Sequence, residues 1–205
     1  MHADYAVEIG PDAPALEVPW IAPSGSLRFL DIRRQPELLL EVREATQNQE
    51  FGRFLAAMNA ERSRLQTVKS DVWITDDLSP EEDIFQARWK FGSYVDLIFV
   101  AMTEQTDFEL HEATAKQLSR LLAKAPEVSA AAEFVIRRCY FHRSADPADS
   151  TDGCCITFYL SGYGDDEDQA RRRWSVALDL VQNAIVQVTH AKADGASGST
   201  ITPGP

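Results

Sequence analysis

The sequence predicts an α+β fold: an antiparallel sheet of about four strands with helices packed on one face. Two observations predict it. Stretches that alternate polar and apolar residues, the pattern of strands with one buried face, occur as two consecutive pairs. Segments with the three- and four-residue spacing of helices precede, separate and follow these pairs. The resulting order is helix-strand-strand-helix-strand-strand-helix, which favours hairpins with their helices gathered on one side.

Residues 1–35 predict an extended N-terminal arm with short strands. The arm contains three apolar stretches separated by proline- and glycine-rich turns, which are "YAVEI", "LEVPW" and "LRFLDI". Residues 36–190 are predicted to form a single α+β domain. The tail, residues 191–205, has no apolar periodicity and is predicted to be disordered.

The predicted domain opens with a helix at Pro36, because proline suits the first helical position. The first strand pair follows, and comprises "TVKSDVWITDD" and "QARWKFGSYVDLIFV". Ser79 and Glu82 have the spacing of a capping box, in which a serine and a glutamate satisfy each other's backbone N–H groups. A short helical turn is therefore expected between these two strands.

A second capping box, formed by Thr106 and Glu109, predicts the start of the middle helix. The second strand pair comprises "EFVIRRCYFHR" and "CCITFYLSGYG". Asp165 is a suitable cap for the last helix. That helix carries apolar residues three and four apart, which are Ala170, Trp174, Ala177, Leu178, Val181, Ile185 and Val188.

The strand "EFVIRRCYFHR" contains two adjacent arginines, Arg137 and Arg138, which must point to opposite faces of the sheet. The sequence leaves its register open, because a one-residue slip exchanges the two sets of side chains. The register that we favour points Arg137 toward the helices and places Arg138 on a polar face. In the opposite register, Phe134 and Ile136 are buried and Arg138 lies with them.

The polar face is the predicted ligand-binding site, since tyrosine and arginine are enriched where proteins bind partners. Its candidate residues are Arg88, Tyr94, Arg138, Tyr140, His142 and Tyr159. By alternation the same face also carries Lys69, Asp71, Trp73, Lys90, Asp96, Thr157 and Tyr163. The alternative is that the arm packs over this face, for which it has Tyr5, Trp20 and Phe29.

The net charge of −12 argues against DNA and anionic membranes as partners, because both are bound through lysine and arginine. Ten acidic and two basic residues lie between Asp76 and Glu112, a region that offers an alternative docking surface. Three cysteines without a Cys-x-x-Cys pair and four scattered histidines predict neither a metal site nor a cofactor. No signal-peptide pattern or membrane-spanning segment is present, which predicts a soluble, cytoplasmic protein.

These observations favour a soluble, non-enzymatic binding or protein-interaction module, whose partner is a protein or a small anionic ligand. One alternative is a small enzyme that acts on an anionic substrate at the polar face, with His142 or Cys139 carrying the chemistry. A second is single-stranded RNA binding, because aromatic and basic strands stack bases.

The element order over residues 36–190 resembles the small dimeric secretion-chaperone fold, with one strand fewer. A resemblance of fold does not by itself imply a function. A homodimer is a further expectation, because an antiparallel sheet of four strands leaves edges that need covering.

Overall fold

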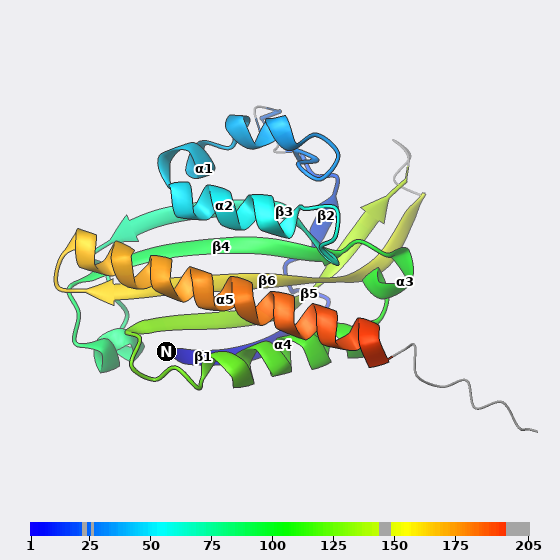
Figure 1. Cartoon of the computed structure of the whole chain (residues 1–205). Coiled ribbons are helices and arrows are strands. Elements are labelled where there is room, and N and C mark those ends of the chain that lie inside the picture. Colours follow the sequence, from blue (N-terminus) through cyan, green and yellow to red (C-terminus); the bar gives the residue numbers. More distant parts are fainter. Residues whose placement is uncertain (22–23, 26, 144–148, 196–205) are drawn as a thin grey trace, which may run out of the picture.

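The computed structural model describes residues 1–21, 24–25, 27–143 and 149–195. It forms two layers, a six-stranded sheet and the longer helices on one of its faces (Figure 1). The strands are β1 (His2–Glu8), β2 (Leu16–Val18), β3 (Leu65–Thr75), β4 (Trp89–Phe99), β5 (Ala130–His142) and β6 (Ser150–Gly164). The α-helices are α1 (Arg43–Gln47), α2 (Gln49–Met58), α3 (Met102–Gln105), α4 (Phe108–Leu122) and α5 (Glu167–Gly195), and the 3-10 helices are η1 (Pro36–Glu41) and η2 (Pro80–Phe85). No helix in these ranges is long and apolar enough to cross a membrane.

The sheet has the order β1-β5-β6-β4-β3, and β2 also pairs with β5. The hairpins β3–β4 and β5–β6 are antiparallel, and β4 pairs with β6 between them. In contrast, β1 and β2 run parallel to β5. The prediction of an antiparallel sheet of about four strands is therefore wrong. The sheet is mixed and six-stranded, because two strands of the N-terminal arm add to the edge of β5.

The helix α5 lies across β4 and β6, and α4 lies beside it over β1 and β5 (Figure 1). The predicted apolar stripe of the last helix is confirmed, since its members Ala170, Trp174, Ala177, Leu178, Val181, Ile185 and Val188 are all buried. The close approach of α5 requires a glycine on β6. A Cβ atom at Gly162 would lie 2.2 Å from the backbone nitrogen of Trp174.

Two helical segments differ in extent from the prediction. The helix expected from Pro36 is divided into η1, α1 and α2. The last helix continues to Gly195, into the segment predicted to be disordered, and residues 196–205 lie outside the described part of the chain.

The helix caps agree with the prediction at one place and differ at two. The capping box of Ser79 and Glu82 is confirmed at the start of η2. At the start of α4 the cap is Asp107, whose carboxylate accepts a hydrogen bond from the Leu110 N–H at 2.9 Å. Thr106, the predicted cap, instead ends the short helix α3. At the start of α5 the cap is Asp166, whose carboxylate accepts a hydrogen bond from the Gln169 N–H at 2.7 Å, and not the predicted Asp165.

The register of β5 is the opposite of the one that we favoured. Phe134 and Ile136 face the helices and are fully buried. Arg137 consequently points to the other face, and Arg138 lies on the face that carries the helices. The reason is that β5 is covered on both sides, since Cys139 is also fully buried on the opposite face. Apolar residues then occupy both sets of alternate positions, so alternation does not identify the buried face.

Candidate functional site

The face of the sheet opposite α2, α4 and α5, here called the outer face, has a covered end and an open end. At the covered end, a small core lies beneath the arm and contains Val68, Ile98, Cys139 and Cys155. Trp20 of the arm packs on this core, and its indole N–H donates a hydrogen bond to the Val68 carbonyl at 2.9 Å. The arm therefore covers one end of the outer face and leaves the other accessible.

The open end contains a hollow of about 420 Å³, here called the sheet groove. Small side chains of β5 and β6, Ala131 and Ser161, lie between its larger lining residues. The aromatic residues that line it are Trp73, Tyr159 and Tyr163. The size of the groove falls within the range of small-ligand sites, and four of its eleven lining residues are charged.

Trp73 packs closely on the sheet because β4 carries Gly92 opposite it. The two residues are paired across β3 and β4, and a Cβ atom on Gly92 would lie 2.5 Å from the indole ring. The centroid of the Trp73 ring lies 6.5 Å from that of Tyr94, and Tyr94 in turn lies 6.1 Å from Tyr159. An aromatic strip therefore crosses the three neighbouring strands β3, β4 and β6.

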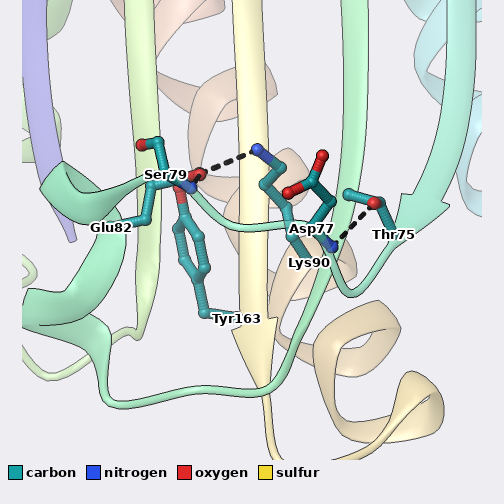
Figure 2. Close-up of polar contacts among 6 residues, drawn as sticks. All are labelled: Thr75, Asp77, Ser79, Glu82, Lys90 and Tyr163. Atoms are coloured by element: carbon teal, nitrogen blue, oxygen red, sulfur yellow. Dashed lines mark hydrogen bonds and ion pairs between the residues drawn. The ribbon is translucent and has the colours of Figure 1, made fainter.

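Glu82 of η2 connects two strands at one end of the sheet groove. Its carboxylate accepts hydrogen bonds from Lys90 Nζ at 2.9 Å, from the Tyr163 hydroxyl at 2.6 Å and from the Ser79 N–H at 2.9 Å (Figure 2). Burial by itself would raise the pKa of Glu82, but the hydrogen bonds from Tyr163, Lys90 and Ser79 hold it below its ordinary value. The carboxylate is therefore ionised at neutral pH and compensates the charge of Lys90.

Asp4 and Glu133 place two carboxylates next to each other at the sheet groove. They are paired on the parallel strands β1 and β5, line the groove together, and are both exposed. No ion pair joins either carboxylate to a cation within the described residues. Like charges that lie directly opposite each other on neighbouring strands repel.

A second hollow of about 210 Å³, here called the arm hollow, is bounded by residues 14–16 of the arm. It contains Asp96, whose carboxylate accepts a hydrogen bond from the Thr157 hydroxyl at 2.5 Å. Asp96 is 6% exposed, and burial raises the pKa of its carboxyl group, although Thr157 and the positive charges of Lys69 and Arg137 oppose the rise. Shifted groups of this kind occur at catalytic sites and in structural networks.

Arg137 connects the arm hollow to β1. Its guanidinium donates hydrogen bonds to the Glu8 carboxylate at 2.9 and 3.0 Å and to the Tyr159 hydroxyl at 2.9 Å. Tyr159 lines both hollows. Arg137 is thus the arginine of the outer face, and Glu8 compensates its charge.

The structure places the predicted site residues in separate locations. Tyr94 and Tyr159 lie together on the outer face. Arg88 is exposed immediately before β4. Arg138 and Tyr140 lie on the face that carries the helices, where Arg138 donates to the Tyr140 hydroxyl at 3.4 Å.

Of the two residues considered for chemistry, His142 lines a separate hollow of about 590 Å³ that is bounded by Val18 and Phe29 of the arm, and Cys139 lies in the buried core. His142 Nε2 is 3.7 Å from the carboxylate of Glu17, at the far end of β5. Cys139 is fully buried, and a hydrogen bond with Cys155 together with burial raises the pKa of its thiol. A buried thiol with a raised pKa is a poor nucleophile at neutral pH.

Residues outside the predicted set complete the two hollows. Alternation predicts Trp73 and Asp96 on this face, although neither belongs to the predicted set of site residues. The position of Arg137 depends on the register of β5, which alternation leaves open. Asp4 and Glu133 meet because β1 pairs with β5, and no local pattern in the sequence indicates a parallel pairing between segments so far apart.

The acidic region between Asp76 and Glu112 does not form one surface. Glu82 contacts Lys90 and Tyr163 at the start of β4, whereas Glu104 pairs with Arg64 beyond its other end. Between them the chain passes through the eleven residues of β4, among which the side chain of Asp96 is buried. The acidic residues of this region therefore serve separate local roles.

Within the ranges that the structure describes, no group of three or more histidine, cysteine, aspartate or glutamate residues is placed to hold a metal ion. No protein-family model, curated protein or solved structure matches the chain. The architecture defines an α+β protein with a mixed six-stranded sheet.

Proposed function

We propose that the protein is a non-enzymatic binding module that holds a small ligand in the sheet groove. One observation carries this proposal: the hollow of about 420 Å³ at the open end of the outer face. Its aromatic residues Trp73, Tyr159 and Tyr163 offer contact area, and the small side chains of Ala131 and Ser161 leave space between them.

Binding is favoured over catalysis in this groove because Glu82, Lys90 and Tyr163 are engaged with one another. Glu82 accepts from Lys90 and Tyr163, so a substrate would have to displace one of these contacts to reach the carboxylate. RNA binding receives less support, since the carboxylates of Asp4 and Glu133 oppose the approach of a phosphate.

The test is a screen of small molecules against isotope-labelled protein, with amide chemical shifts as the readout. We expect shifts that cluster on the strands of the sheet groove. Ala131→Leu should fill the space between the aromatic residues and weaken any such ligand by about 10-fold or more, equivalent to about 1.4 kcal/mol. Ala113→Leu, an equal enlargement at an exposed position of α4, is the matched control and should leave affinity unchanged.

Circular dichroism and thermal unfolding establish that both variants are folded before their affinities are compared. If ligands shift other surfaces, or bind both variants equally, the groove is not the binding site and the proposal fails.

A second candidate function is acid-base catalysis on a small substrate in the arm hollow. The observation that favours it is the buried carboxyl group of Asp96 beside Lys69, a cation that would attract an anion and that forms no ion pair within the described residues. Its test is turnover of a panel of anionic esters and phosphate esters. Turnover that is lost in Asp96→Asn would establish it, and the absence of turnover in the wild-type protein would exclude it for those substrates.

A further inference from the structure

The sheet groove combines an aromatic lining with an excess of negative charge, and this combination specifies a ligand chemistry. We infer that the groove binds a small organic cation that carries ammonium groups, an inference that rests on the proposed binding function. The aromatic residues, the charges and the position of the groove each favour such a ligand.

The aromatic residues favour a cation with an organic body. The faces of tryptophan and tyrosine rings attract ammonium groups within about 6 Å, and the contact strengthens where water is excluded. Trp73 and Tyr159 border the groove from β3 and β6, and Tyr159 is paired with Glu133 across β5 and β6. The Arg137 guanidinium already lies 5.5 Å from the centroid of the Tyr159 ring. The ring that we assign to an ammonium group is therefore that of Trp73, with Glu133 supplying the carboxylate.

The charges of the groove favour a cation over an anion. Lys90, a cation in its lining, is compensated by Glu82 at 2.9 Å. Asp4 and Glu133 lie opposite each other on β1 and β5, are exposed, and have no cationic partner within the described ranges. Their mutual repulsion is relieved when a positive group binds between them, so a cation gains from both carboxylates together.

The position of the groove favours a small molecule over a basic peptide. Its floor is formed by β5 and β6, which are paired to each other and to further strands on both sides. A peptide on this floor would gain no main-chain hydrogen bonds from β5 or β6, because the free edges of the sheet lie at β1 and β3, on the two sides of the groove. Glu82 of η2 limits the groove at one end, which suits a short ligand.

The experiment measures binding of 1,4-diaminobutane to the full chain by calorimetry and amide chemical shifts at low ionic strength, with succinate as an anion of similar length. We expect the diamine to bind at the groove, succinate not to bind, and added salt to weaken the diamine. Glu133→Gln and Asp4→Asn should each weaken the diamine by about 10-fold, whereas Asp179→Asn, on the exposed side of α5, should have no effect.

Both groove variants are expected to unfold at a temperature at or above that of the wild-type protein, because each removes a like-charge repulsion. Loss of affinity in a variant with this stability therefore reports the ligand contact. A variant that unfolds earlier would contradict the repulsion on which the inference depends.

The outcomes separate this inference from the proposed function. Succinate binding in the groove would contradict the inference that the ligand is a cation, and so would equal diamine affinity in Glu133→Gln and Asp179→Asn. Either result would leave the proposed binding function standing. If a lysine-rich peptide binds more than 10-fold tighter than the diamine, the inference that the ligand is a small molecule is wrong and a basic peptide is the better assignment. If Ala131→Leu changes the affinity of none of the ligands found in the small-molecule screen, the proposal that the groove is a binding site fails as well.

Discussion

Asp96 shows how the surroundings of one residue set its chemistry. It belongs to an alternating strand that places it on the polar face, yet the arm and neighbouring side chains leave it 6% exposed. Thr157 donates a hydrogen bond to its carboxyl group. Burial, rather than the neighbouring cations Lys69 and Arg137, determines the direction in which its pKa moves.

The raised pKa of Asp96 predicts a pH-dependent stability. The folded protein holds this proton more tightly than the unfolded chain does, so stability falls as pH rises from about 4 through the folded pKa. An asparagine at this position would keep an oxygen acceptor for Thr157 without the charge. We expect the free energy of unfolding of Asp96→Asn, relative to that of the wild-type protein, to increase as the pH rises from 4 to 8. The increase should be about 1.4 kcal/mol for each pH unit by which folding raises the pKa of Asp96.

Urea unfolding of both proteins at the two pH values measures this gain. Asp71→Asn is the control, because Asp71 is exposed on the neighbouring edge strand. A difference between Asp96→Asn and the wild-type protein that is the same at pH 4 and pH 8 would contradict the prediction.

The short helix η2 shows how an element can shape a site without contributing to the main core. It has no buried residue, but its capping box holds Glu82 where it reaches β4 and β6 (Figure 2). Phe85 at its end stacks on Tyr163 with ring centroids 3.9 Å apart. Two side chains therefore attach η2 to the sheet, and one end of the sheet groove depends on them.

We expect Glu82→Gln to destabilise the protein by about 1–3 kcal/mol, because hydrogen bonds to a charged group are lost. The glutamine amide offers one acceptor oxygen where the carboxylate serves Lys90, Tyr163 and Ser79. Thermal unfolding at neutral pH measures the loss. The folded pKa of Glu82 lies below its ordinary value, so the difference should shrink as the pH falls through that pKa.

Asp83→Asn removes an exposed carboxylate from the same turn and serves as the control. If this control destabilises the protein as much as Glu82→Gln does, the contacts with Lys90 and Tyr163 are not the cause.

At the scale of the whole molecule, the N-terminal arm completes the sheet. β1 pairs with β5 over the seven residues His2–Glu8, and β2 continues the pairing further along β5. The arm also covers the small core at one end of the outer face, where Trp20 is anchored by its hydrogen bond to the Val68 carbonyl. The arm therefore covers much of one end of the outer face, where a hollow of about 590 Å³ remains beside Ile98 and Phe141, and leaves the other end accessible.

A chain without residues 1–20 is expected to lose most of the roughly 5–15 kcal/mol that stabilises a domain of this size. The deletion exposes the edge of β5 and the apolar side chains beneath the arm. Loss of cooperative unfolding and binding of a hydrophobic dye measure the effect. Trp20→Phe, which removes one hydrogen bond and keeps both strands, should cost only about 1 kcal/mol.

If the truncated chain unfolds cooperatively with the same midpoint temperature as the wild-type protein, the arm does not contribute the predicted stability. The rest of the chain would then fold without β1 and β2, in line with the domain division that the sequence predicts.

The elements of this protein follow largely from local patterns. The stripe from Ala170 to Val188 specifies the last helix, and the capping box of Ser79 and Glu82 specifies η2. Alternation also places Tyr94 and Tyr159 on one face, because each strand that carries them has its apolar set on the opposite side. These features depend on neighbours within a few residues, and the sequence contains them in full.

The sequence by itself therefore determined the α+β class, the two hairpins and part of the outer face. The tertiary structure decided the mixed sheet, the register of β5 and the meeting of Asp4 with Glu133. Pairing between distant segments leaves no local periodicity, and a strand buried on both sides carries apolar residues at both sets of alternate positions. The site is assembled from these long-range pairings, so packing of the whole chain is what brings its charges and rings together.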